Sequence, residues 1–207
     1  MTRCAGHPYD EKMNLREQQA KQTYEKIFRT AWEMLRDGSF EKLSVDRLCT
    51  LAGISKGGFY HHFSSKDQLL SLMIGSRMGE MITERIEPCM GQKSAFELLE
   101  IYVNTLVEFH EKYPGNTLGR CWAAMVEHPE MTKDIQRMES YQILHKIVAQ
   151  GIAEGSIRKD LDAAFCQSCL NGMINSIILH GTILGEGTQL AAFAKESMKL
   201  IFRALSE

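Results

Sequence analysis

Apolar residues along this chain recur three and four positions apart, which is the spacing of one face of an α-helix. The first such segment predicts a helix with a buried face of six residues: Tyr24, Ile27, Phe28, Ala31, Trp32 and Leu35. Gly38 supplies the expected stop, because glycine commonly follows the last residue of a helix. The period of two that predicts strands does not compete with this pattern.

Two short helices are predicted next. Ser44 is a good N-cap for the first of them, and Gly53 ends it. Ser55 caps the second, which runs to about Phe63. Two short helices joined by a tight turn have the layout of a helix-turn-helix, in which the second helix enters the major groove of DNA.

Longer helices are predicted for the rest of the chain, because its prolines fall between the periodic segments. Their expected ranges are 66–86, 94–112, 118–127, 133–153, 161–184 and 189–205. The pattern therefore predicts an all-α protein in three sections. Residues 1–20 form a tail and the start of the first helix, 21–66 a three-helix domain with the helix-turn-helix, and 67–207 a larger helical domain.

Length and composition are those of an ordinary globular protein. The chain has 207 residues, of which 44% are hydrophobic, so it can bury one sizeable core or two small ones. The first thirteen residues lack the apolar stretch of a secretory signal, and residues 173–184 are too short to span a bilayer. We therefore expect a cytoplasmic protein with its six scattered cysteines reduced.

The charge is unevenly distributed along the chain. The net charge of -2 argues against indiscriminate binding of nucleic acid. However, residues 1–70 hold eleven Lys and Arg against nine Asp and Glu, whereas the remainder holds thirteen against seventeen. The more basic end is the amino end, where the helix-turn-helix is predicted.

The second helix of this motif contains two adjacent glycines, Gly57 and Gly58. An interior helical glycine costs roughly 1 kcal/mol relative to alanine, so a preference of local structure is broken here. Such departures are expected where function dictates the residue, and glycine would allow the helix backbone to approach DNA closely. The alternative is that both glycines lie in the first helical turn, where the penalty is smaller.

The remaining side chains of this segment suit contact with DNA. Phe59 and Phe63, one turn apart, should pack inward. The other side chains then offer donors to phosphates and base edges, and a solvated pair is the alternative for the two adjacent histidines. The predicted set facing DNA is Lys56, Tyr60, His61, His62 and, at the start of the next helix, Lys66.

Residues 43–70 read LSVDRLCTLAGISKGGFYHHFSSKDQLL and resemble the signature of the TetR family of transcriptional regulators. The strongest elements are Ala-Gly-Ile-Ser-Lys-Gly, the step Phe59-Tyr60-His61, and Phe63 followed by Ser64-Ser65-Lys66. The resemblance implies that this segment lies against DNA. With the cap Ser55 included, the candidate DNA-binding residues are Ser44, Ser55, Lys56, Gly57, Gly58, Tyr60, His61, His62 and Lys66.

One position departs from the family pattern. Gly58 stands where relatives often have a small side chain such as Thr, Ser or Ala that can contact a base. We therefore expect fewer direct contacts between side chains and bases here.

The resemblance also implies a homodimer held by the last two predicted helices, 161–184 and 189–205, as a four-helix bundle. The candidate interface residues combine small and apolar side chains: Phe165, Gly172, Ser176, Leu179, Ile183, Phe193, Met198, Ile201 and Phe202. The alternative for each of them is a place in the core of a single chain.

An effector pocket in the section 67–207 is likewise implied by the resemblance. Polar or aromatic residues on otherwise apolar helices are the candidates to line it: Tyr102, Phe109, His110, Trp122, Met125, Tyr141, His145, Asn171 and Asn175. Each could instead be ordinary core. No cofactor is expected, and the expected partners are operator DNA, a small-molecule effector and a second copy of the chain.

Other features of the sequence offer three alternatives to a ligand-responsive DNA-binding protein. The pair Cys166 and Cys169 could sense redox state or a metal, but a zinc site needs two more ligands at recognisable spacing, and we expect no metal. An enzyme would need a phosphate loop, a nucleophile elbow or clustered carboxylates, so we expect none. A helical protein without DNA binding would leave the segment 55–66 unexplained. The hypothesis is a homodimeric repressor released from its operator by a small molecule.

Overall fold

The structure, a computed structural model, describes residues 15–36, 43–112, 116–128, 138–184 and 189–206. Throughout these ranges the regular secondary structure is helical, which confirms the all-α prediction. Contacts divide the chain into two compact units, residues 1–69 and 70–207, called unit 1 and unit 2 below. Among the described helices none combines the length and apolar character needed to cross a membrane.

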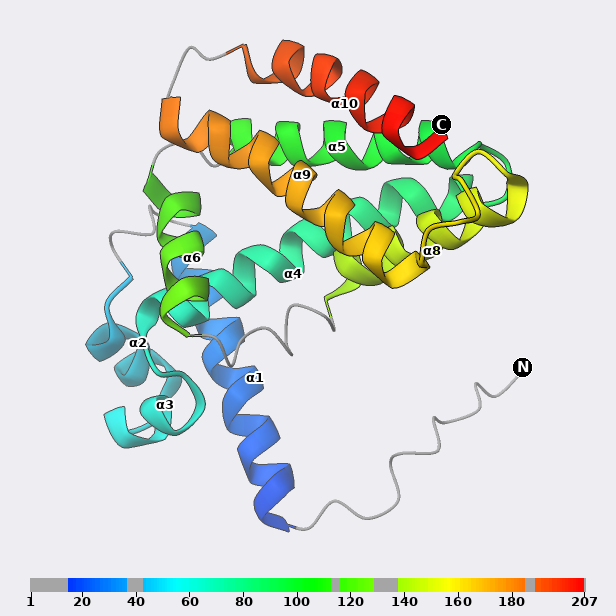
Figure 1. Cartoon of the computed structure of the whole chain (residues 1–207). Coiled ribbons are helices and arrows are strands. Elements are labelled where there is room, and N and C mark those ends of the chain that lie inside the picture. Colours follow the sequence, from blue (N-terminus) through cyan, green and yellow to red (C-terminus); the bar gives the residue numbers. More distant parts are fainter. Residues whose placement is uncertain (1–14, 37–42, 113–115, 129–137, 185–188, 207) are drawn as a thin grey trace. The chain divides into compact units, whose positions relative to one another are not determined.

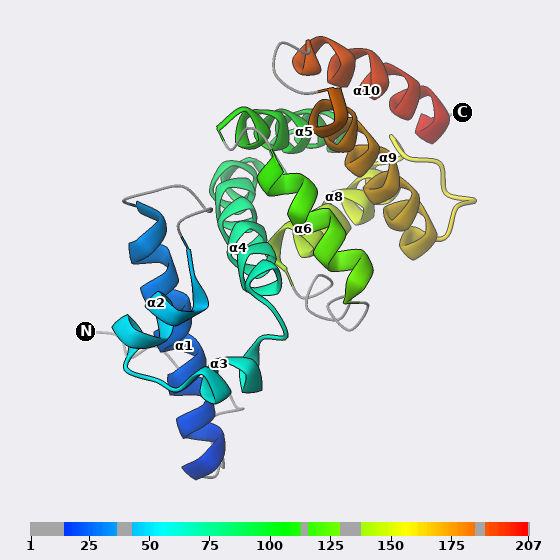
Figure 2. The same ribbon diagram turned by 90° about the vertical axis from the view of Figure 1, so that its left-hand side faces the viewer.

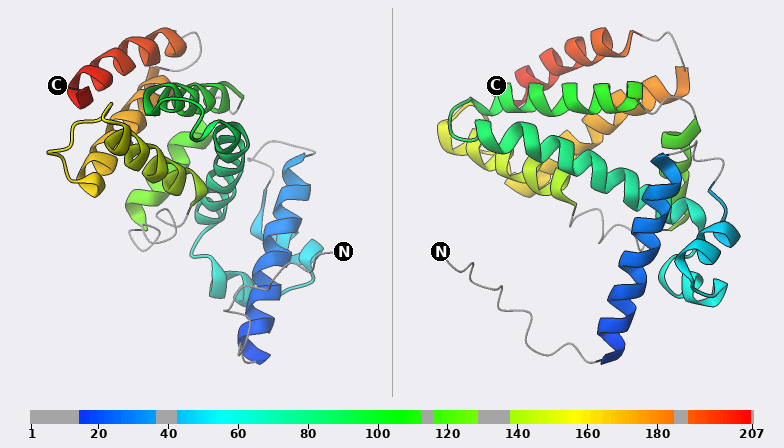
Figure 3. Two further views of the ribbon diagram at one scale, coloured as in Figure 1. Left: turned by 90° about the vertical axis from the view of Figure 1, so that its right-hand side faces the viewer. Right: turned by 180° about the vertical axis from the view of Figure 1, so that it is seen from behind.

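Unit 1 is a cluster of three helices, α1 (Leu15–Arg36), α2 (Val45–Ala52) and α3 (Lys56–His62), all of which contact one another (Figure 3). Their core is made of Ile27, Ala31, Leu48, Phe59 and Phe63, each at most 1% exposed. Of the face predicted to be buried on the first helix, Ile27 and Ala31 are buried, Phe28 and Trp32 are half-buried, and Tyr24 is exposed, so the prediction was wrong for Tyr24. The side chain of Leu35 and the predicted stop at Gly38 lie outside the described residues.

Unit 2 is built from longer helices. Helix α4 (Lys66–Ile86) begins in unit 1 and continues into unit 2, and a short 3-10 helix η2 (Glu87–Cys89) follows it. The remaining helices are α5 (Ala95–Lys112), α6 (Asn116–Glu127), α8 (Glu139–Glu154), α9 (Ala163–Leu184) and α10 (Leu190–Ser206). Most limits agree with the predicted ranges within two residues, and the predicted start of α8 at residue 133 lies outside the described residues.

Helix α9 is the central element of unit 2. It packs against α5, α6, α8 and α10, as Figures 1 and 2 show. Leu170, Ile174 and Ile177 on its inner side are buried. The position of α9 therefore determines where the other four helices can lie.

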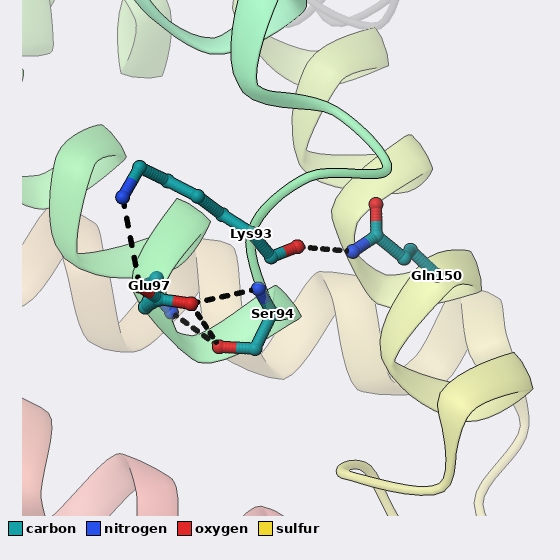
Figure 4. A network of polar contacts seen from close by, with 4 residues as sticks. All are labelled: Lys93, Ser94, Glu97 and Gln150. Atoms are coloured by element: carbon teal, nitrogen blue, oxygen red, sulfur yellow. Dashed lines mark hydrogen bonds and ion pairs between the residues drawn. The ribbon is translucent and has the colours of Figure 1, made fainter.

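The start of α5 shows how local sequence fixes a helix end. Ser94 and Glu97 form a reciprocal capping box: the Ser94 backbone N–H donates to Glu97 Oε2 (2.9 Å), and the Glu97 N–H donates to Ser94 Oγ (3.3 Å) (Figure 4). Gln150 of α8 donates to the Lys93 carbonyl oxygen (2.7 Å), which ties the cap to a neighbouring helix. These bonds from Ser94 lower the pKa of the Glu97 carboxyl.

Replacing Ser94 with alanine should destabilise the protein by about 1 kcal/mol, because the Glu97 backbone N–H loses its acceptor, Ser94 Oγ. The expected fall in Tm is about 2 to 4 °C at neutral pH. Because the pKa of Glu97 is lowered in the fold, its share of the cap is present at neutral pH and is lost as the pH falls through the lowered value. The gap in Tm between wild type and Ser94→Ala should therefore narrow in acid. Ser76→Ala, inside α4, is the control and should not lower Tm, since alanine favours a helix interior.

Candidate nucleic-acid interface and ligand cavity

The turn between α2 and α3 has the geometry that a helix-turn-helix needs. Ser44 caps α2 by accepting a hydrogen bond from the Arg47 N–H (3.2 Å). Gly53 ends α2 with φ 56° and ψ 44°, a left-handed conformation that a side chain would strain. The Ile54 N–H donates to the Cys49 carbonyl oxygen (3.0 Å), so the chain reverses within a few residues. The predicted turn at Gly53 is confirmed.

Helix α3 buries one side and exposes the other. Ser55 caps it by accepting from the Gly58 N–H (3.0 Å). Phe59 and Phe63 point into unit 1, with ring centroids 5.6 Å apart. This inward packing, predicted from their spacing, leaves the opposite side of α3 at the surface of unit 1.

The nine candidate DNA-binding residues are all at least partly accessible. Six are exposed: Ser44, Ser55, Lys56, Gly57, Tyr60 and His61. The other three, Gly58, His62 and Lys66, are half-buried. Unit 1 thus presents hydroxyl, imidazole and ammonium donors around α3 and at the start of α4.

Lys56 is engaged in an ion pair that its sequence position did not reveal. Its Nζ lies 2.6 Å from Asp46 Oδ1 on α2, and the two side chains are 63% and 70% exposed. Hydrogen bonding to Asp46 and its negative charge raise the pKa of Lys56, so the ammonium stays protonated. Such an exposed pair adds little stability. A phosphate that contacts Lys56 would therefore compete with an existing carboxylate partner.

The two histidines have different surroundings. His61 is exposed, whereas His62 is half-buried and meets the Tyr24 ring edge-on at 6.2 Å between centroids. Burial, and secondarily the proximity of His61, lower the pKa of His62, which favours its neutral form. His62 is therefore less solvated than His61.

The adjacent glycines are not required by the fold of unit 1. Both lie in the first turn of α3, and neither has a positive φ. A Cβ built on Gly57 would meet Ser55 Oγ at 3.8 Å, and one on Gly58 would meet Ser55 Oγ at 3.4 Å and Ile54 Cβ at 3.9 Å. These are ordinary contact distances, so the protein itself has room for alanine at either position.

Unit 2 contains a cavity of about 400 Å³ between α4, α5, α6, α8 and α9. Seven of the nine predicted pocket residues line it: Tyr102, Phe109, Trp122, Met125, Tyr141, Asn171 and Asn175. The structure thus brings together, from four helices, side chains that were proposed separately.

The other two predicted pocket residues lie outside this lining. His110 Nε2 is 3.2 Å from Thr182 Oγ1, and His145 Nδ1 is 2.9 Å from Gln167 Oε1. Each of these histidines forms a hydrogen bond with a side chain of α9 and does not line the cavity.

Sequence reasoning missed the rest of the lining: Ser71, Ile74, Gly75, Met78, Leu106, Cys121, Met138, Ser140 and Ile178. Most of these are small or apolar, and their spacing is that of ordinary core residues. Four of them belong to α4, from which the sequence had suggested no pocket residue.

The residues proposed for a dimer interface fall into two groups. On α9, Phe165, Gly172, Ser176, Leu179 and Ile183 are exposed, and on α10 Phe193 is exposed and Phe202 half-buried. Met198 and Ile201, by contrast, are only 5% and 4% exposed within a single chain. These two belong to the core of unit 2, as α10 packs its most apolar stripe against α5 and α9.

Cys166 and Cys169 differ in their exposure to solvent. Cys166 is buried and Cys169 exposed, and both thiols are free. Burial, and to a smaller extent Cys169, raise the pKa of the Cys166 thiol, which disfavours the reactive thiolate. Within the described part of the chain, no group of three or more His, Cys, Asp or Glu could hold a metal ion.

Known proteins resemble the chain in both units. Residues 27–73 match the model of the family described as bacterial regulatory proteins, tetR family. The Transposon Tn10 TetC protein of Escherichia coli is 26% identical over 187 residues, 85% of this chain and 88% of that protein. The Fatty acid metabolism regulator protein of Bacillus subtilis is 20% identical over 189 residues, 88% and 95% of the two chains.

Solved structures share the fold. RolR in complex with resorcinol superposes with a TM-score of 0.63 at 14% identity, over 91% of this chain and 89% of its own. FadR from Bacillus subtilis in complex with stearoyl-CoA gives 0.53 at 19% identity, over 88% and 99%. The matched segment 27–73 contains the whole of the α2–turn–α3 geometry described above. Residues 27–73 therefore match the tetR family of bacterial regulatory proteins, and the chain as a whole shares the fold of these solved structures.

Proposed function

We propose that the protein is a homodimeric repressor whose affinity for its operator falls when a small molecule occupies the cavity of unit 2. The observation that carries this proposal is that α4 contributes residues both to the cavity wall and to unit 1. Four of its residues, Ser71, Ile74, Gly75 and Met78, line the cavity, while its first turn belongs to unit 1. A molecule in the cavity therefore touches the helix that begins in the DNA-binding unit.

Contact with DNA is assigned to the exposed side of α3 and to Lys66. Lys56, Tyr60 and His61 carry donors on that exposed side, and Lys66 follows at the start of α4. Side chains of this kind bind phosphates and base edges. The glycines at the start of α3 leave the helix backbone uncovered for a close approach to the duplex.

The cavity is of the size and character that small-molecule sites have. Its volume of about 400 Å³ lies within the usual range, and its wall is mainly apolar with a few polar groups. Two proteins of similar fold have been solved with ligands, RolR with resorcinol and the transcriptional regulator FadR with stearoyl-CoA. These complexes support a ligand site in unit 2 of this chain.

Dimer formation is supported by apolar surface on α9 and α10. Phe165, Ile183, Leu184 and Leu200 are each at least 58% exposed, which is unusual for such large side chains gathered on two helices that pack together. With one helix-turn-helix per chain, a two-fold dimer would present two α3 helices to an operator of approximate palindromic sequence.

Gly57→Ala should leave the free protein as stable as the wild type or slightly more stable, since a Cβ fits and alanine favours a helix. The same change should lower affinity for operator DNA by about tenfold or more, because the added methyl group separates α3 from the duplex. Thermal unfolding and a gel-shift titration, on duplexes selected by the protein from a random pool, measure the two effects. Unchanged operator affinity would remove Gly57 from the interface.

Ile183→Glu should dissociate the dimer, because Ile183 is 71% exposed and a charge there would be buried on association. Sedimentation at micromolar concentration should show monomers, with helical content unchanged. Val126→Glu is the matched control: Val126 is 80% exposed on α6, outside the two helices proposed to form the interface, so this variant should remain dimeric. A wild-type protein that is monomeric would refute the proposed dimer.

Effector and operator should each weaken the binding of the other by the same factor, as thermodynamic linkage requires. A broad set of small molecules would be screened for thermal stabilisation, and each hit titrated calorimetrically with and without operator. We expect a difference in affinity of about 5- to 150-fold. Met125→Trp, which fills the cavity, should keep operator binding and lose the response. Equal affinities for every tight binder would show that the cavity is not regulatory.

A further inference from the structure

The wall of the cavity carries no formal charge among the residues that the structure describes. Its lining contains no Asp, Glu, Lys, Arg or His. The Tyr102 hydroxyl is buried and donates to the Ser140 carbonyl oxygen (3.3 Å), and burial raises the pKa of this phenol, so it is neutral. An ionised ligand would lose its hydration here without gaining a partner of opposite charge. The wall therefore selects against ions.

Two amides stand out in this wall. Asn171 and Asn175 lie one turn apart on α9, both half-buried and both lining the cavity. Within the described part of the chain neither side chain has a hydrogen-bond partner, whereas Tyr102 and Ser71 are already bonded. Each amide offers both a donor and an acceptor, and a half-buried amide gains from a partner that completes its bonding.

The remaining surface suits a flat apolar body. Aromatic rings from Tyr102, Phe109, Trp122 and Tyr141 line the cavity with three methionines, Met78, Met125 and Met138. Aromatic rings stack on or edge against one another, and flexible thioethers adapt to a ring's outline. At roughly 30 Å³ for each water molecule of the liquid, about 400 Å³ is the volume of about 13 waters. This is the size of a two-ring molecule.

We propose that the effector is an uncharged aromatic molecule of about this size whose hydroxyl or carbonyl group hydrogen-bonds to Asn171 and Asn175. The inference rests on the proposed function, in which this cavity is the effector site. It adds the class of ligand, its neutrality, and the two residues that orient it.

Three compounds with one ring system test the proposal: naphthalene, 2-naphthol and 2-naphthoate. Calorimetry with the full-length protein at neutral pH should show 2-naphthol binding about tenfold more tightly than naphthalene, since naphthalene has no group that forms a hydrogen bond with the amides. The anion 2-naphthoate should bind at least about a hundredfold more weakly than 2-naphthol, because it must be buried without a counter-charge.

Substitutions then locate the polar anchor. Asn171→Leu and Asn175→Leu should remove the advantage of 2-naphthol over naphthalene while naphthalene binding persists, which also shows that the variants are folded. Asn104→Leu, at an exposed position on α5 outside the cavity, is the matched control and should leave the ratio unchanged.

Several results would overturn the inference. These are tighter binding of 2-naphthoate than of 2-naphthol, a ratio unaffected by both substitutions, or no binding by any of the three compounds. None of them removes the proposed repressor function, which depends on the separate titration of screened compounds with and without operator. Conversely, correct ratios with no effect of operator would support the ligand class and refute the regulatory role.

Discussion

Helix α9 is apolar around most of its circumference, and unit 2 is arranged by the need to cover it. One neighbour can bury the single apolar face of an amphipathic helix, but a helix that is apolar on most sides needs neighbours on several sides. Helices α5, α6, α8 and α10 supply that cover. Where they do not meet, two distinct regions remain: the cavity beside Asn171 and Asn175, and the exposed apolar strip that includes Phe165 and Ile183. Both proposed binding regions of unit 2 thus derive from one unusually apolar helix.

In unit 1 the corresponding constraint is the burial of Phe59 and Phe63. Because they are one turn apart, their packing fixes the rotation of α3 about its own axis. The caps at Ser44 and Ser55 and the left-handed Gly53 fix where each short helix begins and ends. Together these few residues determine which side chains of α3 remain at the surface.

These local features could be predicted from the sequence because caps, turn glycines and i, i+4 pairs act within a few residues of one another. The cavity depended on contacts between distant segments, so only part of its wall was foreseen. Aromatic and amide residues stood out on apolar helices, whereas Ile74, Met78 and Leu106 looked like core. His110 and His145 had the same polar appearance but bond α9 instead. The pairing of Asp46 with Lys56 likewise requires two helices to meet, which spacing along the chain does not reveal.

In the free protein the Asp46 carboxylate already occupies the Lys56 ammonium, so it competes with a DNA phosphate for that group. In the proposed complex a DNA phosphate must displace the Asp46 carboxylate, so the net gain from Lys56 is smaller than that of an unpaired lysine. This loss applies equally to every duplex, whereas base contacts are gained only at the correct one. In that complex the carboxylate would therefore shorten the time spent on random DNA and leave more of the protein free to search for its site.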